Sequence, residues 1–307
     1  PEKKKNENER KKMKKLILSL DGGGIRERFV VEILAQIEHS TGQKIHEIFD
    51  LVVGVSAGAI AACFVGEKRY DNISSAVVDE FEVFRQKKGE GLFETMYSGV
   101  GKTNELKVMF QNRKMSELKM DVAVLTTKMK TGEAVVFTNR DLDASTIRIR
   151  DVVDASSAAP VYFPATKLKG EYYMDGGIAT NDPVFVGLEY ARKIWPEIKS
   201  NELAVFSIGT GSAGDVDTES HHPTTYGLVR WLAVGLLSIM TESRRNYNEP
   251  IVRIVVGEEN YLRVTSSTVA QTDNITFEKQ MELSQDAGTI WVNHGSEILD
   301  WLETHRA

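Results

Sequence analysis

The feature that most constrains the fold of this 307-residue chain is a serine between closely spaced glycines, in the segment Gly54-Val55-Ser56-Ala57-Gly58. A largely apolar run, Phe49–Val53, precedes it, and a stretch of small residues follows from Ala59. The run is typical of a buried strand, and the small residues are typical of a helix packed closely against it. Small residues two positions before and after a serine allow it to occupy a strained turn, the nucleophile elbow. The segment therefore predicts a strand–turn–helix unit with a reactive serine; the alternative is a flexible turn without a chemical role.

The same alternation of short apolar runs and helix-like spacing continues along the chain. Leu16–Leu20 is a compact apolar run that ends at a glycine-rich turn. Two further runs, Asp121–Thr126 and Glu133–Thr138, are joined by a turn at Lys130-Thr131-Gly132 and predict an antiparallel hairpin. Strands are also expected at Tyr172–Met174 and Leu203–Ile208, and helices at Phe29–Ile37, Val77–Phe84, Val152–Ala159, Pro183–Ile194, Tyr226–Met240 and Thr276–Thr304. This repetition predicts a three-layer α/β/α fold with a mostly parallel central sheet and an added hairpin.

The composition suits one large globular domain or two small ones, since 41% of the residues are hydrophobic and 27% are charged, and no Pro/Ser-rich linker marks a boundary between two domains. The first fifteen residues stand apart with a net charge of +5. We therefore expect a basic, disordered leader over residues 1–14 and a single domain over residues 15–307. The alternative for the leader is a basic arm that contacts anionic lipid headgroups. Ser212–Thr225, which is rich in Gly, Asp, Thr and His, is expected to be a long mobile loop.

Charge and cysteine content exclude several classes of protein. The overall charge of −6 argues against a nucleic acid partner, whose phosphates require a basic face. Cys63 is the only cysteine, which excludes a disulfide framework and a multi-cysteine metal centre and fits a packed core thiol in a reducing compartment. No apolar stretch reaches the roughly 20 residues of a membrane-spanning helix. The sequence thus predicts a soluble, cytoplasmic protein.

Two further glycine motifs lie at the ends of expected strands. Asp21-Gly22-Gly23-Gly24-Ile25-Arg26 follows the first strand, and its glycines could turn backbone N–H groups toward an oxyanion. Asp175-Gly176-Gly177 ends another strand and presents a carboxylate that could act as a base. Taken singly, the first could also be a phosphate-binding or purely structural turn, and the second a plain turn.

Together, these three motifs, in this order, resemble those of the patatin-like phospholipase family, which pairs D-G-G-G-x-[RK], G-x-S-x-G and D-G-[GA]. The resemblance extends over about residues 15–265. It includes four further stretches: Ala155–Pro160, Tyr162–Pro164, Asn181–Pro183 and Ser207–Gly211.

The resemblance implies a Ser–Asp dyad without a histidine. Ser56 would be the nucleophile and Asp175 the general base, while the backbone amides of Gly22, Gly23 and Gly24 would form the oxyanion hole. Arg26 falls on the basic position of the family, where it would steady the loop or contact a lipid phosphate.

The resemblance also implies a substrate class. Family members cleave acyl esters of membrane phospholipids and related glycerolipids through an acyl-enzyme, without metal, calcium or another cofactor. The chain is accordingly expected to be a phospholipase A or lysophospholipase that contacts membranes peripherally from the cytoplasm. Some members need an activating partner or small molecule.

The chain departs from the family pattern at Glu27, where the family usually has glycine. This departure, which bears on the geometry of the loop, favours a second possibility, a catalytically silent lipid- or partner-binding module on the same scaffold. A third possibility is a triad esterase, because Ser56, Asp175 and His294 follow the chain order of an α/β-hydrolase triad.

Several weaker patterns have ordinary explanations. Gly99–Thr103 looks like the tail of a P-loop, but Met96 stands where that motif needs glycine and no apolar strand precedes it. The adjacent His221 and His222 are expected in a polar loop rather than on one metal ion. Leu228–Met240 predicts a core helix, or alternatively part of a lipid-entry rim, and Phe93, Met96 and Tyr97 are candidates for a mobile lid.

Overall fold

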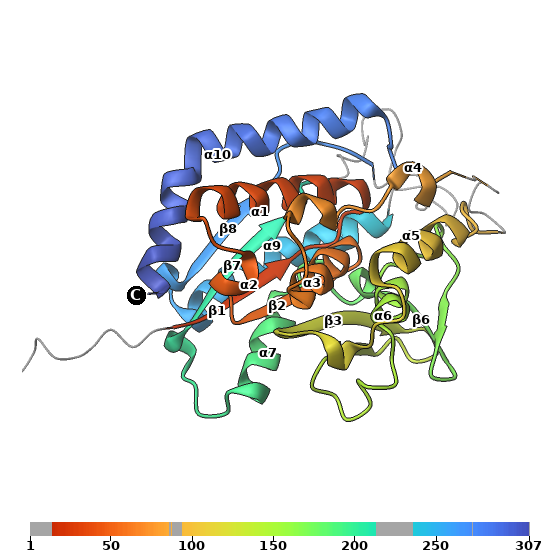
Figure 1. The fold of residues 1–307 in the computed structure, drawn as a ribbon, viewed down its shortest axis with the longest axis horizontal. Coiled ribbons are helices and arrows are strands. Elements are labelled where there is room, and N and C mark those ends of the chain that lie inside the picture. The colour runs from red at the N-terminus through yellow and green to blue at the C-terminus, as the bar shows by residue number, and fades with distance from the viewer. Residues whose placement is uncertain (1–13, 86, 88–93, 213–235, 272, 307) are drawn as a thin grey trace, which may run out of the picture.

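The structure is a computed structural model that describes residues 14–85, 87, 94–212, 236–271 and 273–306. A mixed sheet lies at its centre (Figure 1), with the strand order β5-β6-β3-β2-β1-β7-β8 and with β4 paired to β3. The pairs β3–β2, β2–β1, β1–β7 and β7–β8 are parallel, whereas β3–β4, β3–β6 and β6–β5 are antiparallel. The strands are β1 (Lys15–Leu20), β2 (Leu51–Val55), β3 (Asp121–Lys128), β4 (Ala134–Thr138), β5 (Thr166–Leu168), β6 (Glu171–Asp175), β7 (Leu203–Gly209) and β8 (Tyr261–Thr265).

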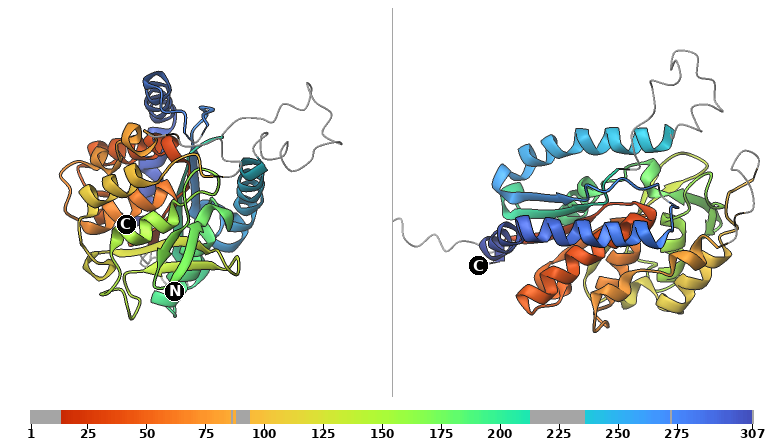
Figure 2. Two further views of the ribbon diagram at one scale, coloured as in Figure 1. Left: turned by 90° about the vertical axis from the view of Figure 1, so that its right-hand side faces the viewer. Right: turned by 90° about the horizontal axis from the view of Figure 1, so that it is seen from above.

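Helices cover both faces of the sheet, and the right view of Figure 2 shows α9 on one side and α10 with α1 on the other. One core cluster holds buried side chains of α1, α3, α5, α6 and α10, and the other holds those of α7 and α9. The helices are α1 (Glu27–Thr41), α2 (Ile45–Ile48), α3 (Ala57–Glu67), α4 (Glu80–Val83), α5 (Val100–Phe110), α6 (Ile149–Ser156), α7 (Val184–Ile194), α9 (Leu236–Val256) and α10 (Phe277–Arg306).

The alternation of side chains along the central strands explains the two core clusters. Leu16 and Leu18 of β1 belong to the cluster under α1, whereas Ile17 belongs to the cluster under α7. Successive residues of a strand point to opposite faces, so a strand that is apolar throughout needs a helical layer on each side. The predicted three-layer α/β/α fold with a mostly parallel sheet and an added hairpin, β3–β4, is thereby confirmed.

Some expected elements differ in extent from the observed ones. The helix expected over Val77–Phe84 is only the single turn of α4, because the side chain of Asp79 caps it by accepting the N–H groups of Phe81 and Glu82. Val77 before it is extended. Helix α6 already ends at Ser156, and α5, β5 and β8 have no counterpart among the expected elements.

Other expectations fall partly or wholly outside the described residues. These are the basic leader, all of the loop Ser212–Thr225 beyond its first residue, and the first ten residues of the helix expected over Tyr226–Met240. Within the described part of the chain, no helix combines the length and apolar character needed to cross a bilayer.

Candidate active site

Ser56 lies at the turn between β2 and α3. Its φ of +56° is left-handed, a strained conformation for a residue with a side chain. Gly54 and Gly58 make the turn possible: a Cβ on Gly54 would lie 2.3 Å from the carbonyl oxygen of Gly58, and a Cβ on Gly58 would lie 2.5 Å from that of Leu20. Since Ser56 immediately precedes α3, negative charge that develops on its substrate would face the positive end of a helix.

Strand β3 brings Asp175 to Ser56, although 119 positions separate them in the sequence. Strand β4 pairs with one edge of β3. On the other edge, β2 pairs with the first part of β3 and β6 pairs with its last part. Strand β2 ends with Val55 opposite Leu125, and β6 ends with Asp175 opposite the next residue, Thr126. The residues that follow these two strand ends therefore meet at one point.

The two side chains form a short hydrogen bond. Ser56 Oγ donates to Asp175 Oδ2 at 2.6 Å, and the N–H of Gly177 donates to Asp175 Oδ1 at 2.7 Å. Burial raises the pKa of Asp175 to about 6, although both hydrogen bonds and the positive charge of Lys102 favour its ionised form. A carboxylate that titrates near neutral pH is suited to accept and return a proton.

The last residue of α6 and the segment that follows it support both members of the pair. Ser156 Oγ accepts the N–H of Ser56 at 2.9 Å and donates to the carbonyl oxygen of Leu125 at 2.7 Å. The carbonyl oxygen of Ala158 accepts the N–H of Asp175 at 3.0 Å. The serine- and alanine-rich stretch that matches the family pattern thus has a structural role that sequence reasoning did not assign.

The glycine loop after β1 passes directly beside Ser56. A Cβ on Gly22 would lie 2.9 Å from the Cβ of Ser56, so this approach requires glycine. The carbonyl oxygen of Gly22 accepts hydrogen bonds from the side chains of Asn181 and Thr210, each at 2.7 Å. Two segments distant in sequence, both part of the family resemblance, therefore hold the loop in place.

The amides of the three glycines are not equivalent. The N–H of Gly22 donates to the carbonyl oxygen of Asn181 at 3.1 Å and is therefore engaged in the fold. For the N–H groups of Gly23 and Gly24, no hydrogen-bond partner is found among the described residues. Gly24 also lines the pocket at Ser56. The amides left for an oxyanion are thus two, whereas the sequence predicted three.

Arg26 is buried and is not among the residues that line the pocket beside Ser56. Its Nη1 donates to the carbonyl oxygen of Ala270 at 2.8 Å, which ties the glycine loop to the segment after β8. Of the two roles expected for Arg26, this position fits steadying of the loop rather than contact with a lipid phosphate.

A buried charge cluster that sequence reasoning missed lies under the glycine loop. Asp21, the first residue of the loop motif, forms an ion pair with Arg263 of β8, and their side chains are only 1% and 4% exposed. Asp182 is buried nearby, where its Oδ1 accepts the N–H of Val184 at the start of α7. Burial and the negative charge of Asp21 raise the pKa of Asp182 to about 7, and Arg263 opposes this effect. No strand was predicted at β8, so Arg263 gave no signal.

A narrow pocket of about 60 Å³ lies beside Ser56. Its wall also contains two acidic side chains, Glu27 and Glu80. The rest of the wall is mostly apolar and includes Ile60, Val77, Val78, Val83, Phe84 and Phe163. The wall of this pocket is therefore mostly apolar, with two acidic residues among those that line it.

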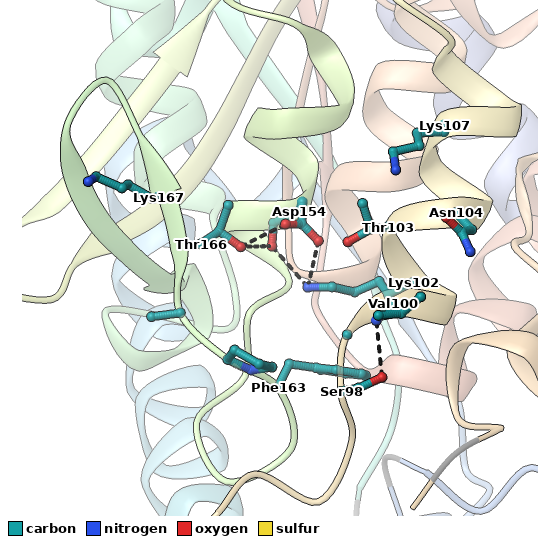
Figure 3. A pocket seen from close by; sticks show the side chains of 13 residues that line it. Ser98, Val100, Lys102, Thr103, Asn104, Lys107, Asp154, Phe163, Thr166 and Lys167 are labelled. Atoms are coloured by element: carbon teal, nitrogen blue, oxygen red, sulfur yellow. Dashed lines mark hydrogen bonds and ion pairs between the residues drawn. The ribbon is translucent and has the colours of Figure 1, made fainter. Parts of the chain in front are cut away.

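Lys102 separates this pocket from a second cavity of about 310 Å³ (Figure 3), since Lys102 and Phe163 line both. The ammonium group of Lys102 lies 3.2 Å from Asp154 Oδ1 and donates to Ser157 Oγ at 3.2 Å. It also lies 4.8 Å from the centre of the Phe163 ring. The stretch Gly99–Thr103, which looks like a P-loop tail, is the start of α5 and directs this lysine inward.

The remaining sequence candidates lie elsewhere. His294 is exposed on α10, where its Nδ1 is 3.3 Å from Glu297, and it does not line the pocket at Ser56. Cys63 is a buried core thiol, and burial raises its pKa. Tyr97 is buried and donates to Asp273 at 2.6 Å. Phe93, His221 and His222 lie outside the described residues. The described residues contain no group of three or more His, Cys, Asp or Glu arranged to hold a metal ion.

Comparisons with known proteins agree with this architecture. Patatin group M-3 and patatin-2-Kuras 4 from Solanum tuberosum are each 25% identical over 319 residues, which cover 89% of this chain and 82% or 84% of the relative. The crystal structure of VipD from Legionella pneumophila is similar to the fold, with a TM-score of 0.54 and 13% identity over 95% of this chain and 67% of that one. The family described as patatin-like phospholipase matches residues 18–188, more than half of the chain. The protein is therefore a member of the patatin-like phospholipase family.

Proposed function

We propose that the protein is a lipid acyl hydrolase of the phospholipase A or lysophospholipase type, with Ser56 as nucleophile and Asp175 as general base. The observation that carries the proposal is the 2.6 Å hydrogen bond from Ser56 Oγ to Asp175 Oδ2 beside an apolar pocket. Membership of the patatin-like phospholipase family supports the same chemistry.

The geometry suggests the following steps. Ser56 Oγ attacks the ester carbonyl carbon while its proton passes to Asp175 Oδ2. The N–H groups of Gly23 and Gly24, with the positive end of α3, stabilise the oxyanion. The tetrahedral intermediate collapses to an acyl-enzyme, and Asp175 returns the proton to the leaving alcohol. Water, deprotonated by Asp175, then releases the fatty acid and restores the serine.

The substrate class follows from the pocket and the family. An apolar pocket at the nucleophile suits the acyl chain of a phospholipid or related glycerolipid. Such chains reside in bilayers, so the protein would act at a membrane surface, as a peripheral enzyme that we place in the cytoplasm. The proposed steps require neither calcium nor another cofactor.

Release of fatty acid from mixed phospholipid vesicles tests the proposal directly. We expect the wild-type protein to release fatty acid at the same rate with and without a chelator, because no step passes through a metal ion. A rate that collapses on chelation would contradict the calcium-independent mechanism. If the wild type is inactive, labelling with a fluorophosphonate separates two cases: a labelled Ser56 indicates a missing activator, and an unlabelled one indicates a silent binding module.

The pH dependence provides an independent check on Asp175. We expect kcat/KM to fall as the pH drops through about 6, because the base must be ionised and burial raises the pKa of Asp175 to about 6. Lys102→Met removes a positive charge that favours the ionised form of Asp175. The acidic limb of the profile of kcat/KM against pH should therefore move to higher pH by about one pH unit.

The lysine experiment has a matched control on the same helix. Lys107 is exposed, so Lys107→Met should leave the acidic limb in place. Because Lys102→Met leaves Asp154 without its ion-pair partner, the variant is best combined with Asp154→Asn. An unchanged acidic limb in both Lys102 variants would show that this lysine does not act on Asp175.

A further inference from the structure

Two side chains hold the peptide group between Gly22 and Gly23 from one side. The carbonyl oxygen of Gly22 accepts hydrogen bonds from Asn181 Nδ2 and from Thr210 Oγ1, each at 2.7 Å. Gly22 and Thr210 are both buried, and Thr210 is only 1% exposed. Because this trans peptide is planar, its carbonyl oxygen and the N–H of Gly23 point in opposite directions. The two side chains therefore fix the direction of the Gly23 N–H.

The strand order shows where that N–H points. Strand β1, which leads into the glycine loop, lies between β7 and β2 in the sheet. Thr210 follows β7, and Ser56 follows β2. A carbonyl group directed at Thr210 faces the β7 side, so the N–H of the same peptide faces the side of Ser56. The layers agree with this direction, because Asn181 leads into α7 on one face of the sheet and Ser56 precedes α3 on the other.

The orientation of this peptide decides whether the loop attracts or repels an oxyanion. In the proposed reaction, negative charge develops on the substrate oxygen beside Ser56, and preorganised N–H groups stabilise it. A peptide between two glycines rotates with little steric cost, since neither residue has a Cβ. Rotation would turn the carbonyl oxygen of Gly22 toward the oxyanion and would deprive that oxygen of both hydrogen-bond donors. The hydrogen bonds from Asn181 and Thr210 thus oppose rotation into a repulsive arrangement.

We propose that Asn181 and Thr210 are positioning residues of the oxyanion hole: by holding the carbonyl oxygen of Gly22, they keep the N–H of Gly23 directed at the oxyanion. The inference rests on the proposed function, because it takes the reaction to be attack by Ser56 on an ester carbonyl. Among the described residues that line the pocket beside Ser56, neither side chain is found, so both act through the peptide rather than on the substrate. Two donors on the carbonyl oxygen also polarise the peptide, which makes its N–H a stronger donor.

Thr210→Val and Asn181→Ala remove the two donors one at a time. Valine keeps the shape of threonine, and alanine at position 181 keeps the backbone carbonyl oxygen that accepts the N–H of Gly22 at 3.1 Å. We expect each variant to lower kcat about 10-fold and the double variant to lower it about 10²-fold to 10³-fold, the loss typical of a missing oxyanion donor. KM should stay within about 2-fold of the wild-type value, because the interaction is made only in the transition state. Thr210→Ser keeps the hydroxyl group and should recover most of the activity that valine loses.

Three readouts separate positioning from a role in folding alone. Expressing kcat per serine titrated to completion with a fluorophosphonate removes the effect of unfolded protein. The acidic limb of kcat/KM should stay at about pH 6 in the double variant, since Asp175 keeps its hydrogen bonds to Ser56 and Gly177. The control Thr41→Val removes a hydroxyl that also donates to a carbonyl oxygen at 2.7 Å, but at the last residue of α1, and should leave kcat unchanged. A double variant with kcat within about 2-fold of the wild type, or with a loss in KM only, would overturn the inference.

A crystal structure of the double variant tests the inference without turnover. We expect the peptide between Gly22 and Gly23 to have rotated, so that the carbonyl oxygen of Gly22 no longer points to positions 181 and 210. If the double variant does not fold, Thr210→Val alone takes its place. A peptide that keeps its orientation would overturn the inference even if the activity falls.

The two experiments together distinguish this inference from the proposed function. If the wild type hydrolyses esters and the peptide of the double variant does not rotate, the inference fails and the function stands. If the wild type neither hydrolyses esters nor reacts with a fluorophosphonate, the proposed function fails. The orientation of the peptide in the double variant then still decides whether Asn181 and Thr210 hold it.

Discussion

Replacing Ser56 by alanine or Asp175 by asparagine is expected to lower kcat for lipid ester hydrolysis by about 10⁴-fold or more. Alanine removes the attacking oxygen. Asparagine can still accept a hydrogen bond at the position of Asp175, which lies 2.6 Å from Ser56 Oγ, but its amide is too weak a base to take the proton. Because the two side chains act as one unit, the double variant should be about as inactive as either single variant. Fatty acid release from vesicles measures the loss, and fluorophosphonate labelling should also disappear in Ser56→Ala.

Two controls give this result its meaning. Both variants should unfold at nearly the wild-type temperature, since each changes few atoms and leaves the hydrogen bonds between Ser156, Ser56 N–H and Leu125 in place. His294→Ala should retain near-normal activity, because His294 is exposed and interacts with Glu297 rather than with the dyad. A large loss in His294→Ala, or measurable turnover by Asp175→Asn, would instead favour a triad.

Arg263→Met is expected to lower the free energy of unfolding by about 3–5 kcal/mol. The substitution leaves Asp21 and Asp182 as buried carboxyl groups without the positive charge that compensates them. The free-energy cost of an uncompensated buried charge exceeds the stabilisation from the apolar contacts that methionine forms. Chemical denaturation monitored by circular dichroism measures the change, and activity should fall as well because Asp21 begins the glycine loop.

A surface ion pair provides the matched control. Arg140 pairs with Asp121, but its side chain is 56% exposed, so Arg140→Met should cost less than about 1 kcal/mol. Adding Asp21→Asn to Arg263→Met should recover part of the lost stability, since the double variant buries one carboxylate fewer. Equal effects of Arg263→Met and Arg140→Met would mean that the buried pair contributes no more than an exposed one.

Much of the fold was predictable because local physics determines it. Largely apolar runs such as Leu16–Leu20, in which Ser19 is the one polar residue, need helices on both faces, and they became central parallel strands. The elements missed include β8, whose short run contains the charged Arg263, and α5, which begins in Gly99–Thr103, a stretch that looks like part of another motif. Their positions depend on partners far away in the sequence.

The residues of the candidate site could also be proposed from the sequence, because they stand in short motifs. The strained turn at Ser56 requires the small residues that flank it, and a glycine loop is needed where backbone approaches the serine. The sequence could not show that the N–H of Gly22 is engaged by Asn181, since this depends on how two distant segments pack. It also could not show that Glu27 and Glu80 share one pocket wall.

The sequence by itself determined the layered fold and singled out Ser56, Asp175 and the glycine loop as candidates, because strand periodicity, steric limits at glycine and the side-chain chemistry of serine and aspartate are local properties. Only the tertiary structure decided that Ser56 and Asp175 meet. The register of β3 places the ends of β2 and β6 at consecutive residues, and burial then sets the charge state of the groups around them. Distances and dielectric surroundings arise from packing between remote segments, which no single stretch of sequence encodes.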